Sequence, residues 1–324
     1  MIVSSSIELR NLTGSYYANN DFTKAKTDVA LETEAIIRLV GKPVYERAKA
    51  IYTPSADGAQ PGTIDSGASD TDKALLQHLQ LPIAMGAAIR YMQANLVSHD
   101  DTSRKVKIDK DRESMPWQWM LDADDHAHIR KKQQVTDRLI AWLDAENILE
   151  WANSDQKKAT KRLFLPSTGA FQEHYPIDHS GLFYHTVRPF MADIQRRDIR
   201  KALGDDYGAL LQAFIDQNIQ PAQEPLLGLT QQALALLTMA KALKRLSIQV
   251  MPEGVMQHFT AERHTQKASQ IPTTEDLRKY ALYLERDAED AIDEIRKYRY
   301  ENQPEYNPQV LIPANDPCRK FART

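Results

Sequence analysis

Hydrophobic positions along the chain recur mainly at the three- and four-residue spacing of amphipathic helices. The spacing is clearest over 277–295 and occurs in a less regular form over 129–143. Two other segments, 75–97 and 226–250, are mostly apolar and rich in Ala or Met, which is typical of helices buried on most of their sides. The pattern predicts a mainly α-helical protein. The apolar positions of the clearest helix are Leu277, Tyr280, Ala281, Leu284, Ala288, Ala291, Ile292 and Ile295.

The predicted elements occur twice in the same order. Residues 38–52 match 200–214, and in both a helix reaches a glycine, turns and restarts. Glycine adopts a left-handed helix C-cap at little cost, so we expect this conformation at Gly41 and Gly204. The chain therefore predicts two tandem helical units, each with a small β-hairpin. The other matching pairs are 12–24 with 166–182, 75–97 with 226–250, and the hairpin signals 95–108 with 248–259.

These matches divide the chain into a first helical unit over 1–154, a second over 155–301 and a C-terminal arm over 302–324. The copies differ most at 53–73, which is rich in Gly, Ser, Asp and Pro and has no apolar periodicity. We expect a flexible insert loop there. Prolines at 304, 308, 313 and 317 prevent one continuous helix and predict an extended arm.

Composition narrows the class of protein. The 324 residues are 42% hydrophobic and 26% charged, as in a soluble globular protein, and the net charge of −3 provides no cationic excess for tight binding to nucleic-acid phosphates. The single cysteine, Cys318, cannot form an internal disulfide and suits a reducing compartment. No signal peptide or run of eighteen apolar residues is visible, so we expect a cytoplasmically made protein without a membrane partner.

The segment 172–185 is the strongest candidate for a metal site. It contains His174, His179 and His185 together with Glu173 and Asp178. The histidines are five and six residues apart, which does not place two imidazoles on one helix face, and no HExxH motif occurs. The matching loop of the first unit, 15–26, contains no histidine.

We therefore interpret both loops as helix entries whose polar residues form turns and caps. Asp178 or Ser180 would cap the helix in the second unit. In the first unit the candidates are Asn20, Asp21 and Thr23.

A second candidate lies over 122–128, where Asp124 and His128 are four residues apart. We interpret its carboxylates as the acidic first turn of a helix, where they face the positive end of the helix dipole. Just before it, Trp117 and Trp119 are expected to pack into the core or an interface. No nucleotide-binding or nucleophile motif is present. We therefore assign no catalytic, cofactor-binding or metal residue, expect no cofactor and predict a protein that is not an enzyme.

Several segments resemble an uncharacterised protein family of Bacteroidota and their phages and prophages, often encoded among virion structural genes. They are 35–41 with Tyr45, 118–125, 182–194 with its Arg188-Pro189 step, and 233–243. The similarity extends from about Ser4 to Tyr300 and implies a virion component. The two-copy helical unit with a hairpin looks like phage head–tail connector (adaptor) proteins, which form rings beneath the portal and leave an arm to clasp a neighbour.

The resemblance implies a structural virion protein, assembled in the host cytoplasm, that self-associates into a ring in the neck. Its partners would be the portal protein and tail or neck proteins, and DNA would pass through the ring without specific binding. Three alternatives stay open: another neck or tail-completion protein, a cytoplasmic helical scaffold for a host partner, and a metal-dependent enzyme. The enzyme would use the cluster at 173–185, with His174, Asp178 and His179, and could add Asp124 and His128.

Overall fold

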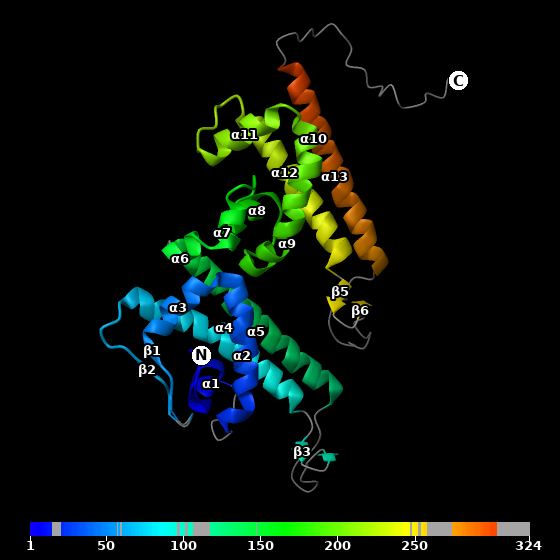
Figure 1. Cartoon of the computed structure of the whole chain (residues 1–324). Helices are drawn as coiled ribbons and strands as arrows, with labels where there is room; N and C mark the ends of the chain where they lie inside the picture. Colours follow the sequence, from blue (N-terminus) through cyan, green and yellow to red (C-terminus); the bar gives the residue numbers. More distant parts are fainter. Residues whose placement is uncertain are drawn as a thin grey trace. The chain divides into compact units, whose positions relative to one another are not determined.

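The computed structural model describes residues 1–14, 21–56, 58, 60–95, 98–100, 103–105, 117–146, 148–246, 248–251, 254–257 and 274–302. Within these ranges the protein is mainly α-helical, as the sequence predicted, and its strands form three separate two-stranded antiparallel sheets (Figure 1). The described chain forms two compact units. The first spans Met1–Pro189, and the second contains residues 190–257 together with the last helix.

The first unit is built around α4 (Asp70–Ala94), which packs against α1 (Ser6–Thr13), α2 (Phe22–Val40), α3 (Lys42–Ala50) and α5 (Gln118–Ala145). Short helices follow: α6 (Leu149–Ala152), α7 (Asp155–Thr160) and α8 (Thr168–His174), and then α9 (Gly181–Ile194). The strands are β1 (Tyr52–Thr53) with β2 (Thr63–Ile64), and β3 (Ser98–Asp100) with β4 (Ser103–Lys105).

The boundary between the units falls at Pro189–Phe190, inside α9, so the predicted division at 154/155 lies within the first unit. Contacts with α5 explain why the chain after 154 belongs there. The Lys157 ammonium is 2.7 Å from Asp144 Oδ1 on α5. The backbone N–H of Leu182 donates to Asp137 Oδ1, also on α5, at 2.7 Å.

Helix α4 confirms the prediction of a helix that is buried on most of its sides. Leu75, Leu76, Leu79 and every residue from Ile83 to Ile89 are buried, so this helix has little exposed surface in its middle. Gly86 lies within that stretch. A Cβ atom at Gly86 would lie 2.3 Å from a carboxylate oxygen of Glu32 on α2, so only glycine permits this approach.

The N-terminus is held by a buried carboxylate. Glu8 is 9% exposed, and its side chain accepts hydrogen bonds from the backbone N–H groups of Ser4 (2.7 Å), Ser5 (3.1 Å) and Gly62 (3.0 Å). The Tyr52 hydroxyl donates to it at 2.7 Å. Burial raises the pKa of Tyr52, so the phenol stays protonated and able to donate. Neutral donors thus stabilise this charge in place of a cation.

Part of the segment 53–73, for which a flexible insert was predicted, is hydrogen-bonded to the N-terminus through the same network. The segment begins with the β1–β2 pair, and Gly62 binds Glu8. The backbone N–H of Ser55 donates to Ser4 Oγ at 2.8 Å, and α4 already starts at Asp70 with Ser69 as its cap. Sequence periodicity did not indicate these contacts, because they are hydrogen bonds to the N-terminus and do not involve an apolar face.

The second unit contains η1 (Gln195–Ile199, a π-helical turn), α10 (Arg200–Leu203), α11 (Asp206–Ile215), α12 (Glu224–Arg245), β5 (Ile248–Met251), β6 (Gly254–Gln257) and α13 (Thr274–Glu301). Helices α12 and α13 lie side by side, yellow and orange in Figure 1. Most of the predicted apolar stripe is confirmed, whereas Tyr280 is 46% exposed. The buried stripe positions are Ala281, Leu284, Ala288, Ala291 and Ile295.

Both units show the same order: a helix, a glycine with positive φ, a short helix, a long apolar helix, a β-hairpin and a long helix. The predicted hairpins correspond to β3–β4 and β5–β6. The predicted left-handed cap is wrong in detail, because Gly41 (φ 93°, ψ 146°) and Gly204 (φ 52°, ψ −125°) have positive φ but a different ψ. Gly14 has the left-handed geometry, with φ 73° and ψ −4°. The sequence repeat itself stays a prediction.

Among the described helices, α12 alone is long and apolar enough to cross a membrane by length and composition. The core helix of a soluble protein meets the same criterion, and 56% of the apolar window of α12 is buried inside its unit.

Substitution of Gly86 by alanine should destabilise the protein. The new methyl group would collide with the Glu32 carboxylate, and we expect a loss of about 1–3 kcal/mol in the free energy of unfolding. Gly228→Ala on α12 is the matched control, because nothing lies within 4 Å of its added Cβ and helix propensity favours alanine by up to about 1 kcal/mol. Urea unfolding of both variants tests this; equal effects would contradict the packing argument.

Glu8→Gln should loosen the N-terminus and the β1–β2 segment together. A glutamine presents an NH₂ group to neighbours that are themselves donors, so we expect a loss of about 2–3 kcal/mol in the free energy of unfolding. Hydrogen exchange should show lower protection of the Ser4 and Gly62 amides. Glu34→Gln, on the exposed face of α2, should change stability by less than about 0.5 kcal/mol.

Candidate functional site

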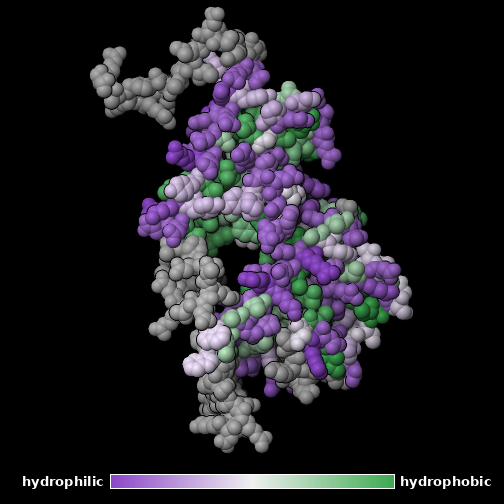
Figure 2. Space-filling model, turned by 180° about the vertical axis from the view of Figure 1, so that it is seen from behind, coloured by the Kyte–Doolittle hydropathy of each residue, from purple (hydrophilic) through white to green (hydrophobic). Residues whose placement is uncertain are grey.

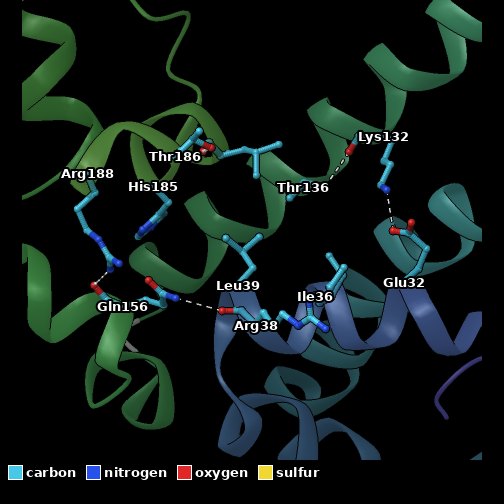
Figure 3. Close-up of a pocket in the computed structure, with 12 residues that line it drawn as sticks. Glu32, Ile36, Arg38, Leu39, Lys132, Thr136, Gln156, His185, Thr186 and Arg188 are labelled. Carbon is cyan, nitrogen blue, oxygen red and sulfur yellow. Dashed lines mark hydrogen bonds and ion pairs between the residues drawn. The ribbon is translucent and has the colours of Figure 1, made fainter. Parts of the chain in front are cut away.

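A cleft of about 430 Å³ opens on the first unit between α2, α5, α7 and α9 (Figure 3). Its walls are part polar and part aliphatic, and the lining residues extend along the chain from Glu32 to Arg188. Helix α2 contributes Glu32, Ala35, Ile36, Arg38 and Leu39; α5 contributes Lys132 and Thr136; α7 contributes Gln156; and α9 contributes Leu182, His185, Thr186 and Arg188.

Glu32 is the buried acidic group of this cleft. Its side chain is 1% exposed and lies 2.5 Å from Arg90 Nε on α4 and 2.6 Å from Lys132 Nζ on α5. Figure 3 shows Lys132 reaching down to the carboxylate. A carboxylate removed from water needs such partners, and this one joins three long helices at one point.

Glu32 is not among the site residues predicted from the sequence, although its position in the helix pattern is unusual. The buried residues of α2 are spaced as Val29, Glu32, Thr33, Ile36 and Val40, so an acidic residue occupies a position of the apolar stripe. A charge at such a position is almost always paired.

His185 contributes an uncharged imidazole. Its ring makes edge-to-face contacts with Trp151 (5.7 Å between ring centroids) and Tyr184 (5.4 Å). Burial lowers its pKa from 6.5 to about 4; the cations of Arg188 and Lys157 act in the same direction, and the Asp144 carboxylate acts against them. His185 is therefore neutral at pH 7. Its Nδ1 atom is buried and has no hydrogen-bond partner in the described chain.

Arg188 lies one helical turn beyond His185 on α9. One guanidinium nitrogen, Nη1, donates to the carbonyl oxygen of Gln156 at 3.1 Å, and the Gln156 amide donates to the carbonyl of Arg38 at 3.1 Å. Figure 3 shows His185 and Arg188 extending from the same helix toward Gln156 and Leu39. No carboxylate of the described residues lies within salt-bridge distance of Arg188. The cleft thus combines a cation, a neutral imidazole and aliphatic side chains, and this combination suits the binding of a ligand.

The histidines singled out at 172–185 do not form one site. His174 is the last residue of α8, whereas the exposed His179 lies in a turn with Asp178. Both turn residues have positive φ, at 53° for Asp178 and 52° for His179. The Gln172 side-chain oxygen holds this turn by accepting from the backbone N–H of His179 at 3.1 Å. No three His, Cys, Asp or Glu residues of the described ranges are placed to hold a metal ion.

The interpretation of the two loops as capped helix entries is confirmed at one residue in each. Ser180 Oγ accepts from the backbone N–H of Phe183 at 3.1 Å, and Asp21 Oδ1 accepts from that of Thr23 at 2.9 Å. Asn20 lies outside the described residues. Asp137 of α5 adds a cap that local sequence could not show, because it accepts from the backbone of α9.

The acidic segment 122–125 is not the first turn of a helix, because α5 already begins at Gln118. That interpretation was wrong by one turn. Within the helix, Asp124 Oδ1 lies 3.5 Å from His128 Nε2 across one turn, and the side chains are 66% and 16% exposed.

The two tryptophans before and at the start of α5 are not packed. Trp117 is 70% exposed and Trp119 is 55% exposed, and the neighbouring Met120 is 42% exposed. Packing into the core was therefore the wrong prediction for them within this chain. Cys318 and the arm after residue 302 lie outside the described residues.

His185 should make the stability of the first unit depend on pH. Because its pKa is lower in the folded than in the unfolded chain, the unfolded state binds more protons between pH 6.5 and 4. Stability is therefore complete above pH 6.5 and falls through this window, by as much as ~3 kcal/mol at pH 4 and about 2 kcal/mol by pH 5.

Urea unfolding at pH 7 and pH 5 measures this dependence. His185→Leu should lose about 2 kcal/mol less than the wild type between the two pH values. His179→Asn is the control, because asparagine tolerates the positive φ of this position. The His179 imidazole is exposed, so its replacement removes no buried group and the pH profile should match that of the wild type. Parallel profiles for all three proteins would contradict a buried neutral His185.

Comparison with known proteins adds one finding. Residues 199–314 match the model of a family of unknown function, DUF6712. The match covers just over a third of the chain; its described residues belong to the second unit and do not include the cleft. No curated protein and no solved structure matches the chain.

Proposed function

We propose that this protein is a structural protein of a tailed-phage virion, a head–tail connector (adaptor) that assembles into an oligomeric ring between the portal and the tail. The resemblance of the sequence to a virion protein family motivates the proposal. The recurring order of elements, with a β-hairpin between two long helices in each unit, fits a subunit that presents two related but different contact regions.

The observation that carries the proposal is the exposure of large apolar side chains on the helix that follows each hairpin. In the first unit they are at the start of α5, and in the second they lie on α13 in the turns after its start. Clustered exposed apolar side chains mark interaction surfaces more often than scattered ones do. The first group is Trp117, Trp119 and Met120, and the second is Tyr280, Leu282 and Tyr283.

Two unlike patches on one subunit suit a closed ring. Contacts that join one patch of a subunit to a different patch of the next are head-to-tail, and they close into a ring when the rotation permits. One group is rich in tryptophan and the other in tyrosine and leucine, so they are chemically distinct. Figure 2 shows that the face drawn is largely hydrophilic, with smaller hydrophobic areas.

The charge of the chain is compatible with DNA passing through such a ring. At a net charge of −3 the protein provides little counterion release from phosphates, so DNA would pass without specific binding. The partners of the ring would be the portal protein on one side and tail or neck proteins on the other. Another neck or tail-completion protein is the nearest alternative, since it would use the same surfaces.

The oligomeric state tests the proposal. Light scattering after size exclusion, and negative-stain images, should show rings or concentration-dependent self-association of the full chain. The double variant Trp117→Glu and Trp119→Glu should weaken self-association about tenfold or more, because exposed tryptophans that become buried dominate interfaces.

Leu149→Glu is the matched control, because it also adds a carboxylate at a strongly exposed apolar residue of the first unit, but this residue follows the far end of α5 from the two tryptophans. It should associate as the wild type does. A wild-type chain that stays monomeric at every concentration and binds neither portal nor tail proteins would overturn the proposal.

A further inference from the structure

The charges that line the cleft do not balance. Lys132 shares Glu32 with Arg90, and Arg38 is 3.5 Å from Glu34 on the exposed face of α2. Arg188 is the cation of the lining left without a carboxylate partner in the described chain. A partly buried guanidinium binds an anion more strongly than an exposed one does, because water screens the pair less.

His185, which also lines the cleft, has a ring nitrogen without a hydrogen-bond partner in the described residues. The Nδ1 atom of His185 is buried without a hydrogen bond in the described residues, although buried polar atoms are nearly always bonded. His185 and Arg188 are three residues apart on α9, so their side chains share one helix face, and both line the cleft. Asp144, Lys157 and Arg188 are the charged groups near this imidazole, and Asp144 is already bound to Lys157 and to the indole N–H of Trp151.

The other wall of the cleft is aliphatic. Ile36 and Leu39 of α2 face it together with Leu182 of α9. A volume of about 430 Å³ is in the range that holds a small ligand or two to three side chains of a peptide. The lining contains no Phe, Tyr or Trp on which a nucleobase could stack.

We propose that this cleft binds a short acidic peptide segment, with a carboxylate held by Arg188 beside the His185 ring and a neighbouring aliphatic side chain against Ile36, Leu39 and Leu182. One uncompensated guanidinium matches the single charge of a carboxylate, whereas a phosphate dianion would lack a second cation. The site uses none of the residues proposed to form the ring, so the two proposals stand or fall independently.

The test is an NMR titration of the full chain, labelled with ¹⁵N at histidine, with the peptide acetyl-Leu-Glu-Leu-amide. We expect a saturable shift of the His185 imidazole signals, assigned with His185→Gln, and binding at least about tenfold tighter than that of the glutamine peptide acetyl-Leu-Gln-Leu-amide. No saturable shift up to about 20 mM peptide, or equal affinity for the two peptides, would overturn the proposal.

Two variants connect the binding to the cleft. Arg188→Gln should lower the affinity about tenfold, whereas Arg196→Gln, at an exposed arginine of the second unit, should leave it unchanged. Because Arg188 also holds the Gln156 carbonyl, Thr186→Glu provides a variant that keeps this contact. Thr186 is exposed and lines the cleft, so the added carboxylate should repel the acidic peptide and abolish the shift. Unchanged binding in both cleft variants would contradict the proposed site.

Discussion

The buried carboxylate of Glu32 is the constraint on which the first unit depends. One carboxylate binds Arg90 of α4 and Lys132 of α5, so the three longest helices of the unit meet at a single charged point. Removing one partner of a buried charge typically costs ~3–5 kcal/mol, while a shift in helix register would break both contacts at once. Apolar packing alone tolerates such shifts far better, because it has little directionality.

The same contact determines the shape of the surface beside it. Helix α2 approaches α4 closely only because Gly86 has no side chain under the Glu32 carboxylate. The Lys132 side chain is engaged in the ion pair with Glu32. The aliphatic residues Ile36 and Leu39 lie one and two turns further along α2, where they line the cleft. On the α9 side of the cleft, burial and the cations of Arg188 and Lys157 keep His185 neutral, and Arg188 is left for an anion.

Local sequence was sufficient for the features that depend on neighbouring residues. Helical periodicity predicted the helix class and the buried middle of α4, and cap chemistry predicted Ser180 and Asp21. It was insufficient wherever the partner is distant. Glu8 binds Gly62, and Glu32 binds Lys132 a hundred residues away, so no spacing rule connects them. The sequence does show a charged residue at a position of the apolar stripe, as at Glu32. Such a residue indicates a buried ion pair, but the sequence does not indicate which residue is the partner.

Exposure was the other property that the sequence could not supply. Trp117 and Trp119 have the composition of core residues, but α5 begins beside them and its buried face is formed by residues further along, such as Leu139, Ile140 and Leu143. Helix α13 also has large exposed apolar side chains, at Leu282 and Tyr283, although Ala281 and Leu284 of the same turn are buried. Exposed aromatics at the corresponding place in both units point to a common constraint on the surface, because the buried cores of the two units do not require either group.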